Sequence, residues 1–164
     1  MKYLDAIEIA NRIKFQLAPC CHRCEIAGSV RRRKSEVHDI EFVIIPMDYE
    51  IGLFASGLGV VLSEWDILKG KPGPDCRYLQ IRLPDGINLD LFFAKPDTYG
   101  FILLLRTGPA LFSKDFVNKL PRRGCRAQDG QIVVAGNGHA IPTPEEVDAF
   151  RLAGLPYIRP EHRY

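Results

Sequence analysis

The chain has 164 residues, a formal net charge of +2 and 46% hydrophobic residues, the composition of a globular protein with one domain or two small lobes. It contains no run near the roughly 18 apolar residues of a membrane span, and its N-terminus shows no signal-peptide pattern. A membrane or secreted protein is therefore not expected. We expect a monomer in the cytoplasm (in a nucleoid, or in the host cell of a virus), with its five cysteines reduced.

The first part of the chain alternates between helical and extended patterns. Apolar residues at helical spacing predict a helix over Leu4–Leu17, which Pro19 ends. Strands are predicted at Arg23–Ala27 and Val37–Pro46, and the segment Ser29–Arg33 between them predicts a short helix. This succession indicates a unit of mixed α and β structure.

A dense group of soft ligands lies between the first helix and the first strand: Cys20, Cys21, His22 and Cys24. Thiol and imidazole groups at this density are compatible with structural zinc if a further ligand such as Cys76 or Cys125 folds close. The alternative is a helix-to-strand connection without a metal. The sequence leaves both open.

The turn Gly28-Ser29, followed by Arg31 and Arg32, suits a phosphate group. Backbone N–H groups at a helix N-terminus and the serine hydroxyl can bind phosphate oxygens. The two arginines can neutralise a polyphosphate. The segment therefore predicts a binding site for the phosphates of a nucleotide.

Three carboxylates lie on predicted strands. Asp39 and Glu41 are two residues apart, so their side chains point to the same face of a strand. Asp90 interrupts an apolar strand, where a carboxylate is costly unless a cation compensates it. Mg²⁺ prefers carboxylate and phosphate oxygens. If the two strands are neighbours, the three carboxylates predict a site for two-metal nucleotidyl transfer.

The middle of the chain predicts loops and a hairpin. Three glycines interrupt the apolar stretch Tyr49–Trp65, which predicts a loop and an imperfect helix, and Lys69–Asp75 predicts a loop. Strands at Cys76–Leu83 and Ile87–Ala94 flank a Pro-Asp-Gly turn and predict a hairpin that carries Asp90.

The character changes beyond residue 98. Helices are predicted at Asp97–Arg106 and Ala110–Leu120, and a hairpin at Arg126–Val134. Thr143 predicts an N-cap, followed by proline at the first helical position, for a last helix that ends near Leu152. The excess of basic over acidic residues also lies in this part of the chain, which suits contact with a phosphate backbone.

The order and spacing of these blocks resemble the family X DNA polymerases. The resemblance rests on Gly28–Arg32, Asp39–Glu41, the Asp90 strand, Thr107-Gly108-Pro109 with Phe112, and Gly154–Glu161. It implies an α+β fold in a short form without the N-terminal lyase domain. Residues 1–98 would form the nucleotidyltransferase palm, a mixed sheet with helices on one face, and residues 99–164 a small α+β thumb-like lobe.

The resemblance also implies roles for individual residues. Asp39, Glu41 and Asp90 would be catalytic and would hold two Mg²⁺ ions, for which Mn²⁺ could substitute. Residues implied to bind the nucleoside triphosphate are Gly28, Ser29, Arg32, Arg106, Thr107, Gly108, Pro109 and Phe112. Residues implied to contact DNA are Ser113, Arg122 and Arg123. The Gly108–Pro109 peptide is expected to be cis.

The function implied by the resemblance is gap-filling DNA synthesis. A dNTP would be transferred to the primer 3′-hydroxyl of gapped or primed DNA, with release of pyrophosphate. A second reading keeps this chemistry but uses NTPs or another acceptor (RNA, a protein or a small molecule), because Arg106 stands where the resemblance places the sugar. A third, non-enzymatic reading as a nucleic-acid-binding protein is disfavoured because all three carboxylates are present.

Overall fold

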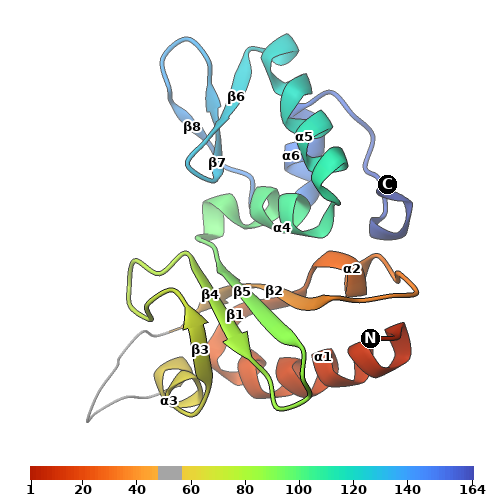
Figure 1. Ribbon diagram of the computed structural model, residues 1–164. Coiled ribbons are helices and arrows are strands. Elements are labelled where there is room, and N and C mark those ends of the chain that lie inside the picture. Colours follow the sequence, from red (N-terminus) through yellow and green to blue (C-terminus); the bar gives the residue numbers. More distant parts are fainter. Residues whose placement is uncertain (48–56) are drawn as a thin grey trace. The chain divides into compact units, whose positions relative to one another are not determined.

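The computed structural model describes residues 1–47 and 57–164, and it has a mixed α+β architecture (Figure 1). The chain divides into two compact units, an N-terminal unit, Met1–Ala94, and a C-terminal unit, Lys95–Tyr164. No helix among the described residues is long and apolar enough to cross a membrane.

The N-terminal unit contains three α-helices and one five-stranded sheet in the described residues. The helices are α1 (Tyr3–Leu17), α2 (Gly28–Arg31) and α3 (Leu58–Ser63), with a 3₁₀ turn at Ala18–Cys20. The strands are β1 (Cys21–Ile26), β2 (Asp39–Pro46), β3 (Asp66–Lys69), β4 (Tyr78–Arg82) and β5 (Asn88–Phe93). Their order in the sheet is β1-β2-β5-β4-β3. Only the β2–β5 pair is parallel, so the sheet is mixed.

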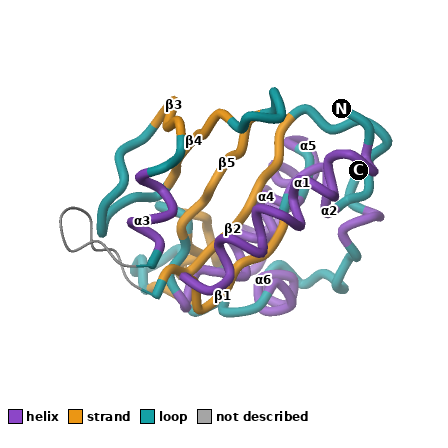
Figure 2. The backbone as a smooth tube through the Cα atoms, turned by 90° about the horizontal axis from the view of Figure 1, so that it is seen from below, coloured by secondary structure: helices purple, strands orange, loops and turns teal. Residues whose placement is uncertain are grey.

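One face of this sheet is apolar and is covered by helices. Helix α1 buries Ile9, Ile13 and Leu17 at helical spacing, and alternate residues of β2, such as Ile40 and Phe42, are fully buried in the same core. Residues of α3 belong to this core as well. Figure 2 shows α1 and α3 crossing the same side of the sheet. Because side chains alternate along a strand, the other residues of β2 point to the opposite face.

The C-terminal unit packs three helices beside a small antiparallel sheet. The helices are α4 (Tyr99–Thr107), α5 (Ala110–Lys119) and α6 (Glu146–Leu152), with 3₁₀ turns at Pro96–Thr98, Leu120–Arg123 and Pro160–His162. The strands, in the order β6-β7-β8, are β6 (Cys125–Gln128), β7 (Gln131–Val134) and β8 (Ala140–Ile141). An aromatic core joins α5 to α6, since the rings of Phe116 and Phe150 meet edge to face at 5.4 Å.

Most of the predicted elements are confirmed, and the differences are strands β3 and β8 and the N-cap of α6. Strand β3 was not predicted, because four residues at an exposed edge lack a clear alternation. The N-cap of α6 is Glu145 and not Thr143. Thr143 is buried instead, where its N–H donates to the carbonyl of Asp97 at 2.7 Å. In the predicted Tyr49–Trp65 segment, residues 49–56 lie outside the described residues, and α3 follows them.

We predict that Gly100→Ala destabilises the C-terminal unit. A Cβ at Gly100 would lie 2.1 Å from the backbone carbon of Glu145, and the Gly100 N–H donates to the Thr143 carbonyl at 2.8 Å. Helices α4 and the start of α6 would have to separate, at a cost of about 1–3 kcal/mol. Urea unfolding measures this cost. Gly136→Ala is the matched control, because no atom lies within 4 Å of its added Cβ; equal effects of the two changes would contradict the prediction.

Candidate functional site

The parallel pairing of β2 and β5 brings the three predicted carboxylates to one face of the sheet. In the register of this pair, Glu41 lies opposite Asp90 and Asp39 lies opposite Asn88. Asp39 and Glu41 are two residues apart and share the face that α1 and α3 do not cover. All three acidic residues are partly buried. This pairing fulfils the condition under which the sequence predicts a common site.

The Asp90 carboxylate is held by the neighbouring strand β4. The Tyr78 hydroxyl donates to Asp90 Oδ1 at 2.9 Å, and the Gln80 side-chain amide donates to the same oxygen at 3.0 Å. Sequence analysis did not single out these two residues. The predicted hairpin could have identified them, because alternate residues of β4 share a face with alternate residues of β5.

The Glu41 carboxylate lies against the Gly28 turn. A Cβ at Gly28 would fall 1.7 Å from Glu41 Oε2, and Gly28 has a φ of +59°, so only glycine fits this position. The Ala27 N–H donates to the Glu41 carbonyl at 2.8 Å, which ties the turn to β2. The predicted phosphate turn and the predicted carboxylate strand are therefore in direct contact.

Next to this turn, the hydroxyl oxygen of Ser29 is buried and has no hydrogen-bond partner among the described residues. A buried hydroxyl without a partner is costly and is uncommon in native proteins. It fits a residue whose partner is a bound ligand, as the prediction of phosphate binding requires.

The Asp39 carboxyl lies in an environment that disfavours its charge. Burial raises its pKa above the ordinary value, and the negative charge of Asp90 raises it further, while the charges of His38 and Arg32 oppose the rise. Two carboxylates that repel each other across neighbouring strands are a donor set that a divalent cation would neutralise. The chemistry of these residues therefore fits Mg²⁺.

The carboxylates do not converge on one point. Across the described residues, no group of three or more His, Cys, Asp or Glu side chains could hold a metal ion as placed. Glu41 lies against Gly28, and one oxygen of Asp90 accepts from Tyr78 and Gln80. The two paired strands supply the common face on which these side chains lie.

We predict that Asp39→Asn stabilises the protein at neutral pH when no divalent cation is present. The pKa of Asp39 is raised in the folded state, so the wild type loses stability as the pH rises through this pKa, and the variant does not. The advantage of the variant should therefore be present at pH 7 and shrink as the pH falls toward 4. Urea unfolding across this range measures it.

Asp75→Asn is the matched control, because it makes the same chemical change in an exposed loop. An Asp39→Asn variant that is less stable than the wild type at pH 7 without metal would contradict the electrostatic argument.

The cysteine group lies on β1 and the turn before it. Cys21 and Cys24 are buried, and their thiols form a hydrogen bond that raises the pKa of Cys21 and lowers the pKa of Cys24. All five cysteines are free thiols. Among the described residues, no three such ligands lie close enough together to hold a metal ion, and whether this group binds zinc stays a prediction.

The predicted nucleotide block of the C-terminal unit forms the corner between α4 and α5. Arg106 is exposed, Thr107 is fully buried, and Gly108 and Pro109 are extended. A Cβ at Gly108 would lie 2.5 Å from the Phe112 ring, so glycine lets this ring approach the corner. The prediction of a cis Gly108–Pro109 peptide is wrong, because the described chain contains no cis peptide bond. Two extended residues make the corner with a trans bond.

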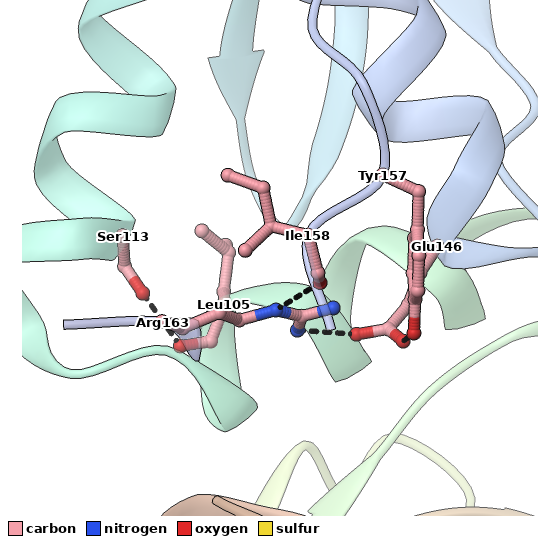
Figure 3. A network of polar contacts seen from close by, with 6 residues as sticks. All are labelled: Leu105, Ser113, Glu146, Tyr157, Ile158 and Arg163. Atoms are coloured by element: carbon pink, nitrogen blue, oxygen red, sulfur yellow. Dashed lines mark hydrogen bonds and ion pairs between the residues drawn. The ribbon is translucent and has the colours of Figure 1, made fainter. Parts of the chain in front are cut away.

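Of the three residues predicted to contact DNA, two are exposed. Arg122 and Arg123 are exposed residues of the 3₁₀ turn Leu120–Arg123. Ser113 is only partly exposed, and its hydroxyl donates to the Leu105 carbonyl at 2.9 Å, as Figure 3 shows. This hydrogen bond links α5 to α4.

Arg163, near the C-terminus, is buried, and the sequence did not predict its burial. Arg163 is fully buried and donates to Glu146 Oε1 at 2.6 Å and to the Ile158 carbonyl at 3.0 Å (Figure 3). Its guanidinium group lies within 6 Å of three aromatic ring centres, those of Phe112, Phe150 and Tyr157. No local pattern distinguishes Arg163 from the exposed arginines, so only the fold reveals it.

Comparison with known proteins points in the same direction as the site. The chain is 28% identical over 162 residues to DNA polymerase lambda of Rattus norvegicus, an alignment that covers 85% of this chain and 28% of the polymerase. The chain thus spans about 28% of the length of this curated relative. No family model matches the chain. At this distance, the similarity supports a polymerase-like or nucleotidyltransferase-like enzyme at a coarse level.

Proposed function

We propose that this protein is a gap-filling DNA polymerase that transfers a nucleotide from a dNTP to a primer 3′-hydroxyl. The observation that carries the proposal is the position of Asp39, Glu41 and Asp90 on one face of β2 and β5, with Glu41 against the Gly28 turn. The similarity to DNA polymerase lambda supports the same class of reaction. In this reaction the primer oxygen attacks the α-phosphate in line and pyrophosphate leaves.

In the proposed mechanism, Asp39, Glu41 and Asp90 would hold two Mg²⁺ ions. The ions, when bound, stabilise the charge on the attacking and leaving oxygens. The carboxylates must be ionised to bind a metal ion. The pKa of Asp39 is raised by burial and by the charge of Asp90, and a bound cation would offset both effects. Binding of the cation is therefore expected to release a proton from that fraction of Asp39 that is still protonated.

The Gly28 turn is proposed to bind the triphosphate. The Ser29 hydroxyl, buried and without a partner among the described residues, would donate to a phosphate oxygen. Arg32, which lies near enough to lower the pKa of Asp39, would add positive charge. These contacts orient the phosphates, and orientation with charge stabilisation supplies most of the rate enhancement in phosphoryl transfer.

Residues of the C-terminal unit are proposed to contact the sugar, the base pair and DNA. Candidates are Arg106, Thr107, Gly108, Pro109 and Phe112 for the nucleotide, and Ser113, Arg122 and Arg123 for DNA. Arg106 is exposed and charged, so it would favour polar contact with the nucleotide. We expect Arg106 to affect mainly the selectivity between dNTPs and NTPs.

The test is extension of a labelled primer on a one-nucleotide-gapped duplex with Mg²⁺, with each dNTP and each NTP supplied separately. Templated single additions that Asp90→Ala abolishes would support the proposal. The ratio of dNTP to NTP incorporation would report the effect of Arg106. Nucleotide binding without addition to DNA would overturn the polymerase assignment and favour a nucleotidyltransferase with another acceptor, which RNA acceptors in the same assay would reveal.

A further inference from the structure

One oxygen of the Asp90 carboxylate already accepts two hydrogen bonds. Both the Tyr78 hydroxyl, at 2.9 Å, and the Gln80 amide, at 3.0 Å, donate to Oδ1. A carboxylate oxygen offers about two acceptor positions. Oδ1 is therefore saturated by protein donors, and among the described residues neither donor reaches Oδ2.

The two donors are fixed in position by the sheet and not by chance contact. Gln80 lies directly opposite Asp90 in the β4–β5 register, and Tyr78 lies opposite Phe92. The rings of Tyr78 and Phe92 also pack with their centres 5.1 Å apart. A side chain held by a strand register and a ring contact loses little further freedom when it binds. The strand register and the ring contact therefore favour the hydrogen bonds to Oδ1.

We propose that Tyr78 and Gln80 select Mg²⁺ over Ca²⁺ by leaving Asp90 only one oxygen with which to bind a cation. The inference rests on the proposed function, which assigns Asp90 to a metal site. Mg²⁺ binds in near-ideal octahedral geometry at about 2.0–2.1 Å and accepts single carboxylate oxygens. Ca²⁺ takes about 6–8 oxygens and often binds both oxygens of one carboxylate. A carboxylate that can bind a cation only through Oδ2 therefore suits Mg²⁺ better than Ca²⁺.

Tyr78 and Gln80 would therefore be positioning residues, acting through Asp90. The direct consequence is a change in metal preference when they are removed. Without the two donors, Asp90 gains a second oxygen for Ca²⁺ and loses its fixed orientation for Mg²⁺. Loss of such an outer hydrogen bond typically lowers metal affinity about 10- to 100-fold.

The test uses the double variant Tyr78→Phe/Gln80→Met of the full chain. Phenylalanine retains the ring that packs on Phe92, and methionine retains the length of glutamine, so the fold should persist. Displacement of Mn²⁺ by Mg²⁺ or by Ca²⁺, followed by the electron paramagnetic resonance signal of free Mn²⁺, gives both affinities without an activity assay. We expect Mg²⁺ affinity to fall about tenfold, and Ca²⁺ affinity to hold or rise. A general loss of structure would weaken both ions alike.

The matched control is Tyr3→Phe/Gln16→Met, which makes the same chemical changes on α1, on the opposite side of the sheet. It should leave the ratio of the two affinities unchanged. The single variants Tyr78→Phe and Gln80→Met should each shift the ratio in the same direction as the double variant. They serve in its place if it does not fold.

The outcomes separate this inference from the proposed function. A wild type that binds Mn²⁺ and Mg²⁺, with variants of unchanged Mg²⁺ to Ca²⁺ ratio, would overturn the selectivity inference and leave the proposed function standing. A wild type that binds none of these cations would overturn the proposed function and the inference with it.

Discussion

Replacing Asp90 with asparagine is expected to lower nucleotide transfer by about 10³-fold while the protein stays folded. The amide is nearly the same shape as the carboxylate, and its oxygen can still accept from Tyr78 and Gln80. What is lost is the negative charge. A metal that stabilises the developing charge contributes several kcal/mol, and each 1.36 kcal/mol changes a rate about tenfold.

Single-turnover extension of a gapped primer measures this loss, and the thermal midpoint in the absence of metal verifies folding. Asp66→Asn is the matched control. It removes a carboxylate from β3 of the same sheet, where Asp66 forms an exposed ion pair with Arg82 at 3.9 Å, and exposed pairs contribute little. Retention of full activity by Asp90→Asn would remove Asp90 from the site. Loss of activity in both variants would show that the effect is not specific.

Replacing Arg163 with methionine is expected to destabilise the protein by about 3–5 kcal/mol, because the Glu146 carboxylate would stay buried without the positive charge of the arginine. Arg163 is fully buried, and Glu146 is 6% exposed. The arginine also donates to the Ile158 carbonyl and contacts three aromatic rings. Since whole domains are stable by only about 5–15 kcal/mol, this one change should remove much of the stability.

Urea unfolding followed by far-ultraviolet circular dichroism measures the change. The double variant Glu146→Gln/Arg163→Met should recover part of the loss, because removing both members of a buried pair leaves no unpaired charge. Arg151→Met is the control, since the Arg151–Asp148 pair at 3.2 Å is exposed on the arginine side and should contribute less than about 1 kcal/mol. Equal losses in Arg163→Met and Arg151→Met would contradict the assignment of Arg163 as a buried anchor.

Asp90 and Arg163, on which these predictions rest, differ in how well the sequence predicts their importance. Asp90 was conspicuous, because a carboxylate in the middle of an apolar strand needs a partner. Arg163 was not, because a basic residue near the end of a chain is usually solvated. Its burial depends on the aromatic residues of α5 and α6 and on Glu146, which are distant from it in sequence.

The sequence by itself determined the order and type of most elements, and it predicted the residues to which we assign the proposed chemistry. Helix α1, strands β2, β4 and β5 and helices α4 and α5 follow from apolar periodicity and from glycine and proline at their ends, which are local properties. The shared direction of Asp39 and Glu41 follows equally from the two-residue period of a strand. The Gly28 turn was found in the same way.

Only the tertiary structure decided which strands are neighbours and which side chains meet. The parallel pairing of β2 with β5, which sets Glu41 opposite Asp90, joins segments that a helix and two other strands separate in the chain. The same holds for the contact of Glu41 with the Gly28 turn and for the pairing of Arg163 with Glu146. These features arise from packing between distant segments, whose free energy no local pattern of residues records.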